Sequence, residues 1–144
     1  SRLRKAVSFR LNHSFSDRLD LRSGYRFYTD DWGISAHSVD LEPHFRLRGE
    51  REMWLFPILR FSTQAGADWF GAPGTFTGAE SYYTSDWDLA ETTTQKYGVG
   101  FTLRTRPGQT WLGIFRRFEA RAAVYDRDDG LTAFSTSFSF GWTY

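Results

Sequence analysis

The sequence has no cysteine, no long apolar run and a formal net charge of only +1. The lack of cysteine excludes disulfide bonds and cysteine-based metal or redox chemistry. The mean hydropathy is −0.50, and no uninterrupted apolar stretch approaches the roughly 20 residues that a transmembrane helix needs. The small net charge gives no electrostatic reason to expect a nucleic acid as partner.

Aromatic and charged side chains are both abundant, at 19% and 24% of the 144 residues. This length suits a single domain, which we take as residues 1–144. A transmembrane β-barrel can combine such contrasting residues, because each of its strands exposes only alternate side chains to lipid.

The last eleven residues, 134–144, alternate between large aromatic and small or polar side chains. A period of two indicates a β-strand with one apolar and one polar face. An apolar face this aromatic suits a lipid-facing wall better than a small soluble core. The stretch resembles the C-terminal assembly signal of bacterial outer-membrane barrels, which typically ends in an aromatic residue. The aromatic residues of this predicted signal are Phe138, Phe140, Trp142 and Tyr144.

The same alternation recurs along the chain and predicts an all-β fold, an antiparallel transmembrane β-barrel of about seven strands. The predicted strands cover residues 6–12, 19–28, 38–47, 53–61, 96–104, 118–125 and 134–144. Residues 111–118 have two interpretations. Their aromatic spacing fits a short amphipathic helical turn at a membrane interface, or they form the ragged start of the sixth strand.

The connections agree with a barrel whose C-terminus lies in the periplasm. Bacterial barrels have short periplasmic turns and longer external loops, and the longest connection, 65–94, then becomes an external loop. The connection 105–117 does not fit well, because it is longer than a usual periplasmic turn. The external connections are then 29–37, 65–94 and 126–130, and the periplasmic ones are 16–18, 48–51 and 105–117.

The number of predicted strands is odd, whereas single-chain bacterial barrels normally have an even number from about 8 upward. We therefore expect the chain to be the C-terminal part of a larger barrel and to be incomplete at its N-terminus. The alternative is that one strand within 105–125 has been miscounted.

The segment Tyr25-Arg-Phe-Tyr-Thr-Asp-Asp-Trp-Gly-Ile34 resembles a motif of a family of uncharacterised outer-membrane β-barrel proteins of Gram-negative bacteria. The later segment from Leu59 to Phe70 is similar to an arginine-bearing strand of that family and its continuation. The resemblance implies a barrel in the bacterial outer membrane, with the membrane lipid and the barrel assembly machinery as partners. It implies no activity.

The polar phase of the predicted strands is strongly charged. An arginine or lysine that faces lipid near the midplane costs roughly 2–4 kcal/mol, so we expect this phase to face the lumen. It could select anionic solutes, or its charges could form cross-strand ion pairs that brace the wall. The predicted lumen-facing charged residues are Arg10, Arg22, Arg26, Asp40, Glu42, Arg46, Arg60, Lys96, Arg104, Glu119 and Arg121.

The predicted fourth strand breaks the pattern, because Trp54, Phe56 and Ile58 occupy its lumen phase. A water-filled lumen has no use for three large apolar side chains, so we expect a plug or a partner subunit to pack against them. Pro43 and Pro57 face each other if the turn at 48–51 sets the register, and two facing prolines predict a local gap or bulge in the ladder.

No catalytic, metal or cofactor site stands out. The three histidines, His13, His37 and His44, are too dispersed for a metal triad. Ser38 and His44 could belong to a lipase-like set, but the only argument for it is that both lie on the same face of a predicted strand. Residues 126–130 lack the ligand spacing of a calcium loop. We therefore expect no enzyme and no cofactor.

These observations predict a porin-like barrel that passes small solutes across the outer membrane. A second hypothesis is a structural or scaffolding barrel, which docks a partner protein or plug through its apolar inner strand and the long loop. A third is a soluble lipocalin-like binding barrel, which would place its apolar phase inside.

Overall fold

The computed structural model describes residues 2–49, 51–105, 110 and 114–142. These residues form seven antiparallel strands in one sheet, which confirms the predicted all-β class and the seven predicted strands. The strands are β1 (Arg4–Ser16), β2 (Leu19–Asp30), β3 (Ser35–Arg46), β4 (Glu52–Gln64), β5 (Thr92–Arg104), β6 (Phe115–Arg127) and β7 (Thr132–Trp142). A short 3₁₀ turn, η1 (Trp87–Leu89), precedes β5. In the described part of the chain, no helix has the length and apolarity that crossing a membrane requires.

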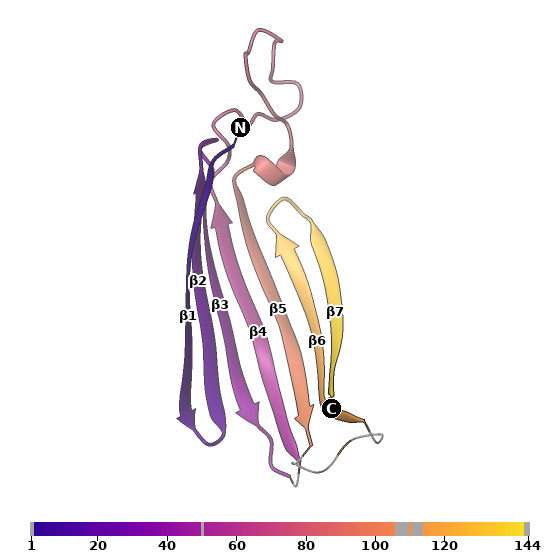
Figure 1. Cartoon of the computed structure of the whole chain (residues 1–144). Helices are drawn as coiled ribbons and strands as arrows, with labels where there is room; N and C mark the ends of the chain where they lie inside the picture. The colour runs from indigo at the N-terminus through magenta and orange to yellow at the C-terminus, as the bar shows by residue number, and fades with distance from the viewer. Residues whose placement is uncertain (1, 50, 106–109, 111–113, 143–144) are drawn as a thin grey trace.

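The strand order in the sheet is the order in the sequence, from β1 to β7. Successive connections therefore lie at alternate ends of the sheet, as Figure 1 shows. The end that carries the N-terminus also carries the β2–β3, β4–β5 and β6–β7 connections. The connections at this end are those predicted to be external, and the connections at the other end are those predicted to be periplasmic. The long connection is shorter than predicted, because residues 92–94 already belong to β5.

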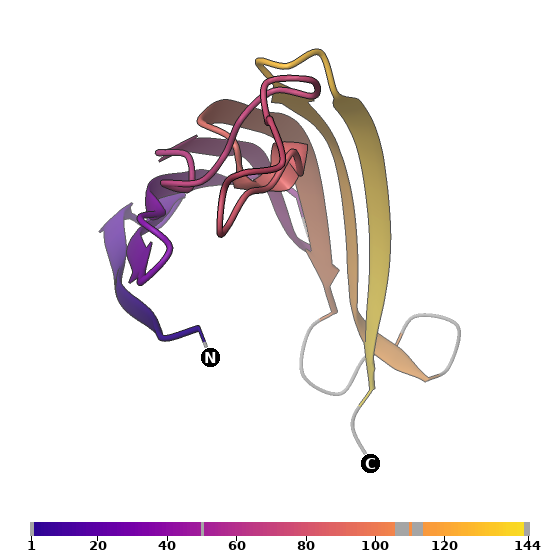
Figure 2. The same cartoon turned by 90° about the horizontal axis from the view of Figure 1, so that it is seen from above.

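The sheet curves from β1 to β7 but does not close (Figure 2). β1 pairs only with β2, and β7 pairs only with β6. Because every neighbouring pair is antiparallel, β1 and β7 run in the same direction. The structure thus contains one open curved sheet of seven strands, and barrel closure stays a prediction.

The two faces of the sheet differ sharply in chemistry. Arg121 of β6 bonds Glu42 of β3 across the two strands between them, which long side chains can do only on the concave face. The charged phase is therefore concave, and the alternate, apolar phase is convex. Large apolar side chains on the convex phase are highly exposed, with Phe9 at 66% and Phe134 at 71%.

The ladder between β3 and β4 is interrupted where Pro43 faces Pro57. Paired residues run from Ala36↔Gln64 to Leu41↔Leu59 and resume at Phe45↔Leu55, so the register is unchanged across the gap. Proline has no backbone N–H, and a facing pair therefore lacks both donors. This confirms the predicted local gap.

The start of β6 confirms one of the two interpretations of residues 111–118. Residues 115–118 lie in the strand, and the register shifts between Phe115 and Arg117. The sixth strand therefore begins raggedly, with a bulge. The remaining part, 111–113, lies outside the described residues.

Candidate functional site

The concave face of the strands carries a large excess of positive charge. Among the described strand residues, eleven basic and six acidic side chains share this phase, although the whole chain has a net charge of +1. All eleven predicted lumen-facing charged residues are on it. The basic ones are Arg4, Arg10, Arg22, Arg26, Arg46, Arg60, Lys96, Arg104, Arg117, Arg121 and Arg127. The acidic ones are Asp20, Asp30, Asp40, Glu42, Glu52 and Glu119.

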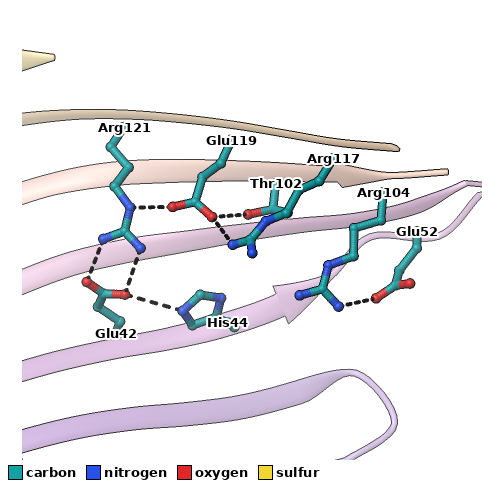
Figure 3. A network of polar contacts seen from close by, with 8 residues as sticks. All are labelled: Glu42, His44, Glu52, Thr102, Arg104, Arg117, Glu119 and Arg121. Atoms are coloured by element: carbon teal, nitrogen blue, oxygen red, sulfur yellow. Dashed lines mark hydrogen bonds and ion pairs between the residues drawn. The ribbon is translucent and has the colours of Figure 1, made fainter. Parts of the chain in front are cut away.

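A connected network of ion pairs spans β3 to β6 on this face (Figure 3). Arg121 Nη1 donates to Glu42 Oε1 at 2.9 Å, and Arg121 Nε donates to Glu119 Oε1 at 2.7 Å. Arg117 Nη2 lies 2.5 Å from the other oxygen of Glu119, which also accepts a bond from the Thr102 hydroxyl at 3.2 Å. One guanidinium thus joins carboxylates from two strands that are not neighbours.

Phe56 is fully buried beside this network, although it belongs to a single-layer sheet. Its ring stacks on the His44 ring at a centroid distance of 4.1 Å, and the Arg121 guanidinium lies 4.9 Å from its centroid. The cross-strand partner on β5 is Gly100. A Cβ built there would lie 2.1 Å from the Phe56 ring, so the ring occupies the space that a side chain would take.

The three apolar residues of the concave phase of β4 are therefore covered to different degrees by the sheet itself. Ile58 faces Gly98 and is 8% exposed. Trp54 is half-buried, and its indole N–H donates to Glu52 Oε1 at 3.0 Å. The wall's own side chains bury Phe56 and Ile58 without a plug, and a partner at Trp54 stays a prediction.

The ion pairs do not use all the charges of the concave face. Arg60 pairs with Asp40 at 2.5 Å, and Arg104 pairs with Glu52 at 3.4 Å. Six basic side chains have no described carboxylate within 4.0 Å. These are Arg4, Arg10, Arg22, Arg26, Arg46 and Lys96. Some of these charges therefore brace the wall, as one hypothesis predicts. The selection of anionic solutes by the others stays a prediction.

The long connection, residues 65–91, has the opposite charge. It contains five acidic and no basic residues, and it lies at the N-terminal end of the sheet (Figure 1). Together with residues 2, 31 and 32 it lines an open pocket of about 1070 Å³. Trp69 lies between Trp32 and Tyr82, at centroid distances of 6.2 and 5.6 Å.

The histidines and Ser38, considered above for metal binding and catalysis, have other contacts in the structure. Ser38 Oγ accepts a bond from Ser62 Oγ at 2.9 Å, and His44 is stacked on Phe56. His37 contacts the Tyr25 hydroxyl on the convex face. No three described His, Asp or Glu residues are grouped closely enough to hold a metal ion.

The predicted C-terminal signal lies on the convex face of β7. Phe138 is 67% exposed, and Phe140 contacts the ring of Phe118 at a centroid distance of 5.3 Å. Trp142 ends the strand, and Tyr144 lies outside the described residues. Its role in assembly stays a prediction.

These features define an all-β protein built on one curved antiparallel sheet with a charged concave face. The chain belongs to the family described as "Protein of unknown function (DUF3570)", whose match covers residues 1–133. No curated protein and no solved structure matches the chain significantly. The family match includes the segment Tyr25 to Ile34, whose resemblance to an outer-membrane motif stays a prediction.

Proposed function

We propose that the sheet is part of the wall of a bacterial outer-membrane β-barrel, in which the concave face lines a passage for small solutes. The observation that carries this proposal is the distribution of side chains between the two faces. The convex face exposes large apolar side chains, whereas the concave face holds most of the charges of the strands. A soluble binding barrel would require the reverse arrangement, with the apolar phase inside.

The composition of the convex face supports lipid as its neighbour. Among the described strand residues outside the concave phase, only Lys5, Arg116 and Asp126 are charged, and all three lie within two residues of a strand end. Charges near the ends of a transmembrane strand cost far less than charges at the midplane. Exposed rings and aliphatic side chains fill the region between.

Closing the barrel with antiparallel pairs alone requires strands in addition to the seven described. An unpaired strand edge in lipid leaves backbone groups without partners, which is costly. Because β1 and β7 run in the same direction, joining them directly would give a parallel pair. An odd number of further strands would allow every pair to be antiparallel, as in other bacterial barrels.

The orientation follows from the connections. We place the end with the long 65–91 connection outside the cell and the β1–β2 and β3–β4 turns in the periplasm, because external loops are the longer ones. The scaffolding alternative is less well supported, since its main argument was the apolar concave phase of β4. Phe56 and Ile58 are already buried by the wall itself.

Conductance across a planar lipid bilayer tests the proposal. The full-length protein is refolded in detergent, its β-structure is verified by circular dichroism, and it is then added to the bilayer. We expect stepwise increases in conductance. A correctly folded, inserted protein that produces no conductance would argue against a passage and in favour of a scaffold.

A further inference from the structure

We propose that the concave face binds a small oxyanion at a site above Gly24, held by Arg10, Arg22 and Asn12. The inference rests on the proposed function, since it names the class of solute that the passage would favour. Phosphate and carboxylate groups share the chemistry that this site would recognise, and the experiment below separates them.

The proposed site is centred on a glycine, Gly24, in the middle of β2. Gly24 of β2 faces Arg10 on β1 and Asp40 on β3. Its backbone is not in the left-handed region, and a Cβ built there would meet nothing closer than 3.6 Å. No turn or steric clash therefore demands glycine here. A glycine inside a strand often marks a place where a ligand approaches the backbone closely.

Gly24 lines a depression of about 460 Å³ on the concave face. Arg10 and Asn12 lie along one side of it on β1, and Arg22 lies on β2 opposite Asn12. Its other polar lining residues are Ser23, Asp40, Glu42 and Arg60. Donors from two neighbouring strands thus surround one open volume.

The charges around the depression do not cancel. Asp40 is paired with Arg60 at 2.5 Å, and Glu42 is paired with Arg121 at 2.9 Å. Arg10 and Arg22 have no described carboxylate within 4.0 Å. The two carboxylates are thus already neutralised, and two guanidinium groups remain to attract an anion.

The available donors suit an oxyanion rather than a halide or a neutral solute. A guanidinium presents a planar fork of N–H groups that matches two oxygens of a phosphate or carboxylate. The Asn12 side chain can add an amide N–H donor. Two arginines and an amide can together satisfy several oxygens of one small anion.

Titration calorimetry with inorganic phosphate, and separately with acetate, tests the site on the protein folded in detergent. We expect saturable binding of at least one of the two probes. The R10Q/R22Q variant should bind roughly tenfold more weakly or worse, because it loses charge-assisted hydrogen bonds. The G24L variant keeps every charge but places a side chain at the base of the depression, and it should weaken binding as well.

The matched control is R26Q, on the same face and strand as Arg22 but outside the lining of the depression. It removes a cation that has no ion-pair partner among the described residues. This variant should bind the probe as the parent protein does. Equal weakening in R26Q would show a diffuse charge effect and overturn the site. The absence of saturable binding of both probes would overturn it too.

The same variants separate this inference from the proposed passage. If the protein conducts, R10Q/R22Q should shift the reversal potential in a KCl gradient towards the value expected for a cation-selective pore. R26Q should shift it less. If the protein binds phosphate but never conducts, the passage is wrong and the site stands. If it conducts without binding either probe, the passage stands and the site is wrong.

Discussion

Arg121 Nη1 on β6 lies 2.9 Å from Glu42 Oε1 on β3, although β4 and β5 separate their strands. Neighbouring strands are about 4.8 Å apart, so three spacings in a flat sheet would place the two backbones roughly 14 Å apart. The concave curvature and the length of both side chains close this distance. The pair therefore acts as a brace across the inside of the curve.

Removing the brace should reveal a coupling energy between the two side chains. A double-mutant cycle with R121M and E42Q should give about 1 kcal/mol, because both side chains are partly exposed and water weakens their attraction. Unfolding in urea measures it. The control cycle is R104M with E52Q, whose pair is longer and more exposed. A coupling no larger than that of the control would contradict the brace.

Substitution of Gly100 should destabilise the sheet through Phe56. In G100A the new Cβ would lie within the ring volume of Phe56, and such overpacking costs about 1–3 kcal/mol. The matched control is G24A, whose Cβ has room, and which should be neutral or slightly stabilising because alanine restricts the unfolded chain. Thermal unfolding in detergent compares the two variants. Equal stability would show that Phe56 is not confined by Gly100.

Replacing the facing prolines should close the gap in the β3–β4 ladder. The double variant P43A/P57A restores both missing N–H donors, and the unchanged register on either side of the gap places them opposite each other. We expect slow hydrogen exchange at the two new amides, measured by NMR in micelles. Exchange at the rate of unstructured amides would show that the gap has another cause.

Arginine should destabilise the protein to very different extents at two adjacent positions of β3. Val39 lies on the convex face and Ser38 on the concave face. V39R should lower stability in lipid by roughly 2–4 kcal/mol. S38R loses the Ser62 bond and faces Arg26, but it should cost clearly less, because its charge stays out of lipid. Unfolding from lipid vesicles measures both variants. Similar costs at the two positions would contradict a lipid-facing convex surface.

The Glu80 carboxyl in the long connection should titrate below its ordinary value of 4.5. The Thr77 backbone N–H is the main cause of the lowered pKa, and the Thr77 hydroxyl and Gly78 N–H also donate to this carboxylate. Because the folded pKa is below the unfolded one, this local stabilisation is complete above the ordinary value. It is lost as the pH falls through the folded pKa. An NMR titration of the Glu80 side chain measures it, with E80Q as the control that should show no such transition.

Periodicity was enough to predict the strands, because one apolar and one polar face impose a strict alternation on each of them. The register across β3 and β4 was predicted from the 48–51 turn, and the paired residues on both sides of the two prolines confirm it. Strand ends were predicted too short, as at Thr92, because polar residues near a strand end carry no alternation signal.

The packing around Phe56 could not be predicted from the pattern of β4 alone. Its burial depends on Gly100 one strand away and on Arg121 two strands away, which requires the register of three strands together with the curvature of the sheet. The stacking of His44 on Phe56 has the same origin. Gly24 and Gly100 were the available signal, since Gly24 lines an open volume and Gly100 leaves room for the Phe56 ring.

The strictly consecutive strand order also has a kinetic consequence. Each strand pairs only with its neighbours in the sequence, so most pairings close a short loop and can form as successive hairpins. Residues 65–91 interrupt this series between β4 and β5. We expect β1–β4 and β5–β7 to form as separate units and their junction to form last. Pulsed hydrogen exchange during refolding would refute this order if the β4–β5 amides became protected first.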